Sequence, residues 1–125
     1  MESKENAMNN DVEILIVEDS PSVRRLIRSI VATLADEIYE CEDGADALTA
    51  YVAHKPDWTL MDIAMKNMNG ITATKLIKDQ YPDAKIIIVT NFDEADLRES
   101  ARQAGACAYV LKENLFEVRR RLQDM

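Results

Sequence analysis

Short apolar runs alternate with segments of helical periodicity along almost the whole chain, and this alternation most restricts the possible fold. The apolar runs are VEILIV (12–17), the segment around 37–41, WTLM (58–61), AKIIIVT (84–90) and CAYVLK (107–112). Each is followed by apolar residues at helical spacing, as in Val23, Leu26, Ile27 and Ile30. Strands that alternate with helices predict a parallel sheet with helices on both faces. We therefore predict an α/β fold built from five strand–helix units.

Capping and breaking residues predict where the helices begin and end. Residues suited to the N-cap precede each helix: Ser20 before Pro21, Asp43, Asn69, Asp93, and Asn114, which forms a capping-box pattern with Glu117. Residues that end helices follow at Lys55-Pro56, Tyr81-Pro82 and Gly105. These local signals agree with the periodicity at every unit.

Length and charge restrict the class of protein. The chain has 125 residues, of which 47% are hydrophobic, and this suffices for one domain with a buried core. We expect residues 1–10 to be a flexible polar lead-in and residues 11–125 to form the domain. The net charge of −8 argues against direct binding of nucleic acid. No apolar run is long enough to span a membrane, and no apolar signal core is present, so we expect a cytoplasmic protein.

The few cysteine and histidine residues do not suggest a zinc site. Cys41 and Cys107 lie beside apolar stretches, and we interpret them as buried free thiols. His54 precedes a turn signal, so we expect a solvated loop histidine. The basic run Arg119–Arg121 is interpreted as the last turns of a helix, where cations complement the helix dipole.

Polar residues stand directly after four of the apolar runs. They are Glu18-Asp19, Asp62, Thr90 and Lys112. The carboxyl ends of parallel strands lie at one edge of the sheet, so these residues should converge on one cleft. Each could instead simply end its strand, but four such endings with complementary chemistry favour a site.

The predicted cleft would hold three carboxylates, one hydroxyl and one ammonium group. Clustered carboxylates repel one another, and Mg²⁺, which prefers oxygen ligands, relieves that repulsion. A metal ion and Lys112 facing Asp62 suggest that a phosphoryl group arrives on this carboxylate. Phosphoryl transfer depends mainly on positioning and on charge neutralisation, to which Thr90 and Lys112 would contribute.

The motifs resemble those of response-regulator receiver domains, the phospho-accepting domains of bacterial two-component signalling. The resemblance covers residues 11–125 and is carried by ILIVEDSPSVRRLI, PDWTLMDIAMKNMNG, IIIVTNF and GACAYVLKEN. It implies a doubly wound, flavodoxin-like five-stranded parallel sheet with strand order 2-1-3-4-5. It also implies a signalling domain rather than an enzyme, with a sensor histidine kinase or a phosphotransfer protein as partner.

The resemblance implies a role for each candidate residue. Asp62 accepts the phosphoryl group; Asp19, Asp62 and the Ala64 carbonyl ligate Mg²⁺, with a contribution from Glu18. Thr90 and Lys112 bind the phosphoryl oxygens, and Thr90 and Tyr109 act as the switch. The output surface would be the fourth helix, fifth strand and fifth helix, acting through homodimerisation or a partner, as in transcription regulators.

The chain departs from the family pattern at several positions near the cleft. Lys66 and Glu113 stand where proline is usual, and we expect a trans Lys112–Glu113 bond. Asn69 replaces a common aspartate, and Asn91 a small residue. In the resembling family, the side chains two positions after the phospho-aspartate and two after the switch threonine flank the path of the hydrolytic water, and here they are Ala64 and Phe92. Neither can hydrogen-bond that water, so we expect slow self-dephosphorylation.

Three alternatives belong to other functional classes. An aspartyl-phosphate hydrolase would use similar carboxylates, but it would usually need a second acid near the nucleophile and a cap over the substrate. A nucleotide-binding module needs a glycine-rich phosphate loop, whereas Gly44, Gly70 and Gly105 are scattered. A receiver-like interaction domain that is not phosphorylated is the third alternative.

Overall fold

The computed structural model describes residues 12–124, so the predicted lead-in at residues 1–10 lies outside the described residues. Strands and helices alternate along the described chain. The strands are β2 (Glu13–Val17), β3 (Glu37–Cys41), β4 (Trp58–Met61), β5 (Ile86–Thr90) and β6 (Ala108–Leu111). The helices are α1 (Pro21–Val31), α2 (Gly44–His54), α3 (Gly70–Gln80), α4 (Ala95–Ala104) and α5 (Phe116–Gln123), the last preceded by a 3-10 turn, η1 (Lys112–Asn114).

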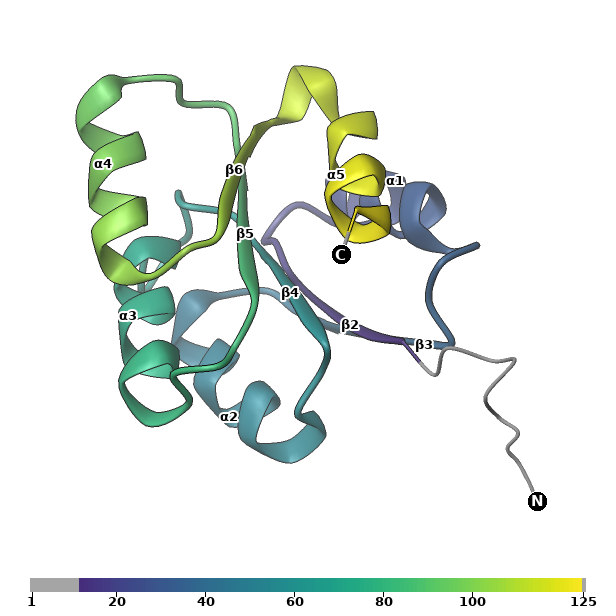
Figure 1. Cartoon of the computed structure of the whole chain (residues 1–125), viewed down its shortest axis with the longest axis horizontal. Helices are drawn as coiled ribbons and strands as arrows, with labels where there is room; N and C mark the ends of the chain where they lie inside the picture. The colour runs from purple at the N-terminus through teal and green to yellow at the C-terminus, as the bar shows by residue number, and fades with distance from the viewer. Residues whose placement is uncertain (1–11, 125) are drawn as a thin grey trace.

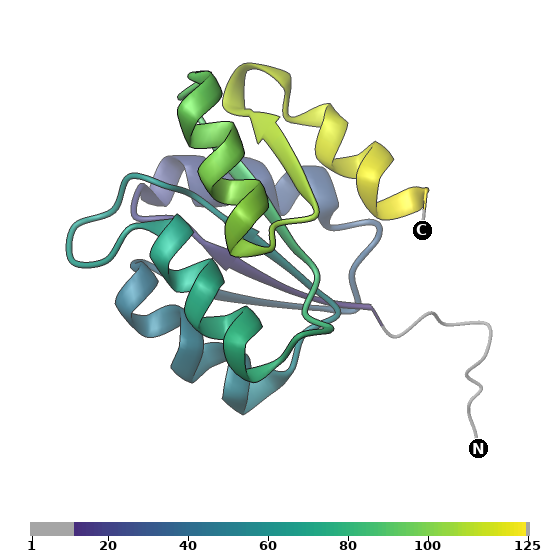
Figure 2. The ribbon, with the colours of Figure 1, turned by 60° about the vertical axis from the view of Figure 1, so that its left-hand side comes forward.

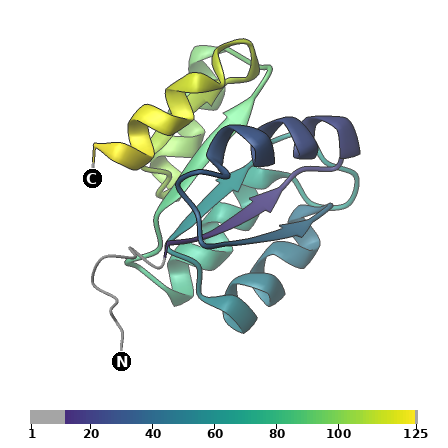
Figure 3. The ribbon, with the colours of Figure 1, turned by 90° about the vertical axis from the view of Figure 1, so that its right-hand side faces the viewer.

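All strand pairs in the sheet are parallel, and the strand order is β3-β2-β4-β5-β6. Counted along the chain, this is the predicted order 2-1-3-4-5, and the predicted fold class is confirmed. The strand arrows in Figure 3 run the same way, so their carboxyl ends share one edge of the sheet. We call this the carboxyl edge.

Helices cover both faces of the sheet. Helices α1 and α5 pack on one face, and α2, α3 and α4 form a layer on the other (Figures 1 and 2). The side chains of β2 alternate between two apolar clusters: Ile14 and Ile16 join the cluster with α1 and α5. Leu15 and Val17 join the cluster with α2, α3 and α4. Burial on both faces explains why the strands are continuously apolar.

The helix starts at Ser20, Asp43 and Asn69 are confirmed. The Ser20 hydroxyl accepts from the Val23 N–H, and the Asn69 side chain accepts from the Thr72 N–H. Each cap satisfies a backbone donor that lacks a partner within its helix. Gly105 ends α4 with a φ of 109°, a conformation that favours glycine.

Two predicted caps are wrong. Asp93 does not cap α4: the N-cap is Glu94, and the Asp93 carboxylate pairs with Arg98 at 2.7 Å. Asn114 lies in the 3-10 turn, and α5 begins at Phe116 without a side-chain cap. The Glu117 carboxylate instead forms ion pairs with Arg120 and Arg121, so the capping box does not form. In both cases the carboxylate pairs with arginine side chains of the adjoining helix instead of capping it.

Two further expectations are corrected in part. Both thiols are free, but Cys41 is half-buried and Cys107 is exposed. His54 is exposed as expected, yet it is the last residue of α2 and its ring stacks on Tyr39 with centroids 3.7 Å apart. The Lys112–Glu113 bond is trans, as are the other peptide bonds described here.

Candidate functional site

Three carboxylates converge at the carboxyl edge. Glu18 and Asp19 directly follow β2, and Asp62 directly follows the neighbouring strand β4. One ligand oxygen from each of the three lies within 4.8 Å of the others. Asp19 is exposed, whereas Glu18 and Asp62 are buried. The predicted convergence of these three carboxylates is therefore confirmed.

Lys112 extends from the end of β6 to two of these carboxylates. Its Nζ lies 2.9 Å from Glu18 Oε1 and 3.2 Å from Asp62 Oδ2. The strand β6 ends at Leu111, and the η1 turn begins at Lys112. Residues 18, 62 and 112 thus come together because β2, β4 and β6 end at one edge.

The charges in this cleft do not balance. Burial raises the pKa of Glu18 and of Asp62, and Lys112 opposes this rise without cancelling it. Burial alone would lower the pKa of Lys112, but its hydrogen bond and charge pairing with the two carboxylates raise it. The Lys112 ammonium therefore pairs with two buried carboxylates, and the Asp19 carboxylate lies nearby. One positive charge near three carboxylates leaves excess negative charge.

The residues fit a divalent cation. Glu18 Oε1 is buried and pairs ionically with Lys112, but it has no hydrogen bond of suitable geometry within the described structure. Hard oxygen ligands held close together, with unrelieved negative charge, match the preference of Mg²⁺. Ala64, whose carbonyl was predicted to complete the site, lies in the exposed turn two residues after Asp62.

The Asp62 carboxylate is oriented by two donors. Its Oδ1 accepts from the Ile63 N–H at 2.8 Å, and its Oδ2 accepts from Lys112. The Asp62 N–H donates in turn to the Val17 carbonyl at 3.0 Å, which extends the β2–β4 ladder by one residue. The side chain is thus held in place on a rigid strand end, while the segment that follows it turns outward (Figure 2).

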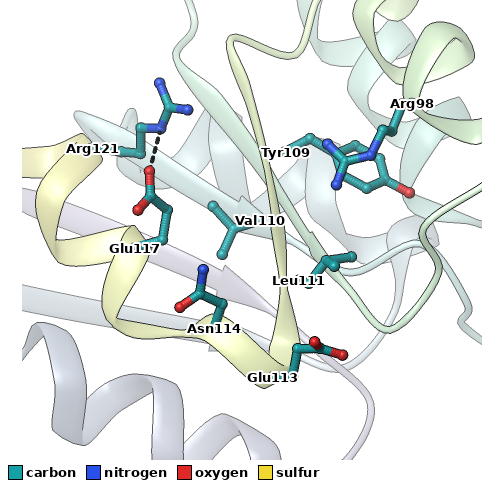
Figure 4. A pocket seen from close by; sticks show the side chains of 8 residues that line it. All are labelled: Arg98, Tyr109, Val110, Leu111, Glu113, Asn114, Glu117 and Arg121. Carbon is teal, nitrogen blue, oxygen red and sulfur yellow. Dashed lines mark ion pairs between the residues drawn. The ribbon is translucent and has the colours of Figure 1, made fainter. Parts of the chain in front are cut away.

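Thr90 ends β5, the strand beside β4, and is fully buried. Its hydroxyl accepts from the Phe92 N–H at 3.3 Å. Tyr109, on β6, donates its hydroxyl to the Phe92 carbonyl at 2.8 Å. The Arg98 guanidinium lies over the Tyr109 ring, 4.6 Å from its centroid (Figure 4). Both predicted switch residues therefore contact the same residue, Phe92, in the loop after β5.

Sequence reasoning missed the residues that support the acidic pair. The Arg24 guanidinium, in the first turns of α1, donates to the Glu18 carbonyl at 2.7 Å and also pairs with Glu40 on the edge strand β3. The Ser20 N–H donates to Glu18 Oε2 at 3.1 Å. The basic character of α1 was visible in the sequence, but no local pattern relates position 24 to position 40.

The scattered glycines serve packing rather than a phosphate-binding loop. A Cβ added at Gly70 would lie 1.8 Å from the Asp62 carbonyl oxygen, and one at Gly44 would lie 2.4 Å from the Met68 carbonyl oxygen. Only glycine permits these close backbone approaches.

None of the helices in residues 12–124 is long and apolar enough to cross a membrane.

Comparison with known proteins agrees with this geometry. The sequence model of the response regulator receiver domain matches residues 14–123. Chemotaxis protein CheY of Bacillus subtilis is 39% identical over 100 residues, which cover 79% of this chain and 83% of CheY. The transcriptional regulatory protein YhcZ of the same bacterium is 38% identical over 104 residues, which cover 82% of this chain and 49% of YhcZ.

Solved structures agree as well. The crystal structure of a LuxR-family DNA-binding response regulator from Staphylococcus aureus superposes with a TM-score of 0.82 at 27% identity, over 90% of this chain and 97% of that one. The present chain spans about half the length of YhcZ and of the related regulators YxjL and LiaR of Bacillus subtilis.

Proposed function

This chain belongs to the response regulator receiver domain family, and on that premise we propose that Asp62 is its site of phosphorylation. The family makes it a signalling domain that is switched by phosphorylation. One observation supports Asp62 above all. Its buried carboxylate lies at the carboxyl edge, grouped with two other carboxylates and 3.2 Å from the Lys112 ammonium. Ligands bind at this edge in open α/β sheets.

The reaction requires charge neutralisation more than covalent assistance. A carboxylate oxygen of Asp62 attacks the phosphorus of a phosphohistidine on a sensor kinase or phosphotransfer protein. The P–N bond breaks, and its electron pair remains on the imidazole nitrogen. Lys112 and the Thr90 hydroxyl then contact the transferred phosphoryl oxygens. Glu18, Asp19, Asp62 and the Ala64 carbonyl would hold Mg²⁺, which would supply the remaining positive charge.

Phosphorylation would change the contacts of the loop after β5. A move of the Thr90 hydroxyl toward the phosphoryl group would loosen its 3.3 Å contact with the Phe92 N–H, and an inward turn of Tyr109 would break its bond to the Phe92 carbonyl. Such exchanges shift a population between two packings. We propose that the change is read on the surface of α4, β6 and α5, through a homodimer or a protein partner.

Regulation of transcription is part of this proposal, because several relatives are transcriptional regulatory proteins. The domain limits of 11–125 and a cytoplasmic location, both expected from the sequence, also remain part of it. The polar surface and the net charge of −8 support recognition of a protein partner rather than of DNA by this domain.

The acceptor can be tested with a small phosphodonor such as acetyl phosphate in the presence of Mg²⁺. We expect one phosphoryl group per chain in intact-mass measurements and no addition in Asp62→Ala. Addition should be normal in Asp79→Asn, which replaces an exposed carboxylate that pairs with Lys75. Labelling of a serine, threonine or histidine in place of Asp62, located by peptide mapping, would contradict the proposal.

A further inference from the structure

The Asp43 carboxylate does more than cap α2. Its Oδ1 accepts from the Ala45 N–H at 2.8 Å, which is the capping bond, and also from the Met68 N–H at 3.0 Å. Its Oδ2 accepts from the Asn67 N–H at 2.8 Å. Only 5% of Asp43 is exposed. A buried carboxylate thus binds the loop that joins β4 to α3, which is the loop that begins with Asp62.

The backbone beside Asp43 contacts the same loop. Because a Cβ at Gly44 would meet the Met68 carbonyl oxygen at 2.4 Å, the start of α2 and the loop lie in direct contact there. The two ends of the loop are joined to each other as well, since the Gly70 N–H at the start of α3 donates to the Ile63 carbonyl at 2.9 Å. The turn at Ala64–Lys66 therefore lies between two anchored points, with Ala64 and Lys66 exposed and Met65 half-buried against the apolar core.

The charged state of Asp43 suits this role. The backbone N–H groups of Ala45 and Asn67 hold the pKa of the Asp43 carboxyl below its ordinary value. An ionised carboxylate forms stronger hydrogen bonds with backbone N–H groups than a neutral acceptor does. Lys66, which stands where the family usually has a proline ring that restricts the backbone, offers no such restriction itself.

We propose that Asp43 is a positioning residue for the phosphorylation reaction, holding the loop of residues 63–69 so that the Ala64 carbonyl and Asp62 meet the same cation. This inference rests on the proposed function. Asp43 would touch neither the metal nor the phosphoryl group. It would act by reducing the number of conformations available to a loop that supplies one of the metal ligands.

The variant Asp43→Asn separates this role from capping. Its side-chain oxygen can keep the bonds from Ala45 and Met68, while its amide group would face the Asn67 N–H, donor against donor. Asp57→Asn, which makes the same change at an exposed carboxylate, is the control. Asp57 Oδ2 also accepts from one backbone N–H, that of Glu13 at 2.8 Å, but it lies at the opposite edge of the sheet.

Mg²⁺ affinity, measured by calorimetric titration, is the main readout. We expect Asp43→Asn to bind Mg²⁺ about tenfold more weakly than the wild type, as is typical when a partner outside the ligand shell is lost. Phosphorylation of Asp43→Asn by acetyl phosphate should be slower than that of the wild type, and the difference should be larger at limiting than at saturating Mg²⁺. The amide protons of Asn67 and Met68 should exchange with solvent faster in Asp43→Asn than in the wild type. This measurement requires neither metal nor phosphodonor.

A second variant covers the case in which Asp43→Asn is poorly folded. Asp43→Ser keeps a good N-cap, but its hydroxyl is too short to reach the loop, so it should show the same Mg²⁺ and exchange defects with an intact helix. Wild-type Mg²⁺ affinity and amide exchange in both variants would overturn the inference. So would an equal loss of affinity in Asp57→Asn, because that loss would reflect general destabilisation.

The two proposals fail separately. If Asp62→Ala abolishes phosphorylation while Asp43→Asn behaves as the wild type, only the positioning role is wrong. If the wild type is not phosphorylated on Asp62, the proposed function is wrong, and the amide exchange and Mg²⁺ titrations still decide whether Asp43 orders the loop.

Discussion

Replacement of Lys112 by methionine should destabilise the metal-free domain at neutral pH. The lysine Nζ lies 2.9 Å from Glu18 and 3.2 Å from Asp62, and its side chain is 14% exposed. Glu18 and Asp62 are only 1% and 5% exposed. Methionine preserves most of the side-chain volume but removes the charge, so two carboxylates would remain buried without a cation.

The size of the effect follows from these contacts. At an effective dielectric constant of about 20, either contact is worth roughly 5 kcal/mol before the cost of removing the charges from water. That cost and the repulsion between the carboxylates offset much of the gain. Removal of one partner from a buried pair typically costs about 3–5 kcal/mol. Because Lys112 is partly solvated, we expect about 3 kcal/mol, or a fall in Tm of about 10 °C.

Urea unfolding followed by tryptophan fluorescence is a suitable assay. The chain has one tryptophan, Trp58, and it is 5% exposed in the folded state. The free energy of unfolding should be compared at neutral pH with a chelator and then with Mg²⁺ in excess. Mg²⁺ should restore part of the loss, because it stabilises only the folded state and supplies the missing positive charge.

The loss should also depend on pH in a defined direction. Burial already raises the pKa of Glu18 and Asp62 in the folded wild type, and removal of Lys112 raises both further. A carboxyl whose pKa rises on folding contributes stability at low pH that is lost as the pH rises through its folded-state value. The difference between Lys112→Met and wild type should therefore be largest at neutral pH and shrink toward pH 4.5, the ordinary value for Glu18.

Lys75→Met is the control, because Lys75 is exposed and its pair with Asp79 spans 3.7 Å. It should change the free energy of unfolding by no more than about 0.5 kcal/mol. If Lys112→Met has an equally small effect, or if its loss is the same at every pH and with or without Mg²⁺, the reasoning about the buried charges is wrong.

The remaining predictions concern the metal, the signal lifetime and the output surface. Asp19→Asn should raise the Tm without Mg²⁺, because it relieves repulsion between the carboxylates. It should also reduce the increase in Tm that Mg²⁺ produces, and an unchanged increase in thermal melts would exclude Asp19 as a ligand. Ala64→Asn combined with Phe92→Glu should hasten loss of the phosphoryl group by holding a water in line. That prediction fails if the wild-type phosphoryl group already disappears within seconds without a phosphatase. Phosphorylation should move the NMR signals of Tyr109 and Arg98, and changes confined to α1 and α2 would indicate another output surface.

Local patterns in the sequence were sufficient to predict the alternating strands and helices and a parallel sheet covered on both faces, whereas the strand order 2-1-3-4-5 was implied by the family resemblance. Continuous apolar runs predicted strands buried on both faces, and the caps at Ser20 and Asn69 predicted helix starts that the structure confirms. These features depend on contacts within a few residues, so they can be read from spacing alone. The convergence of Glu18, Asp62 and Lys112 could also be predicted, because the topology of a parallel sheet brings strand ends to one edge.

Side chains with a choice of partners were decided only by the tertiary structure. Asp93 was expected to cap α4 and Glu117 to complete a capping box with Asn114, but Asp93 pairs with Arg98 of α4, and Glu117 pairs with Arg120 and Arg121 of α5. Asp43 was expected only to cap α2, yet it also binds backbone N–H groups 24 and 25 residues further along the chain.

The sequence by itself therefore determined which elements form and which edge of the sheet carries the acidic site. The tertiary structure alone decided how that site is supported: Lys112 pairs with Glu18 as well as with Asp62, and Asp43 holds the loop after Asp62. The physical reason is one of range. Periodicity and capping are set by neighbours in sequence, whereas a buried charge takes whichever partner the fold places within hydrogen-bonding distance.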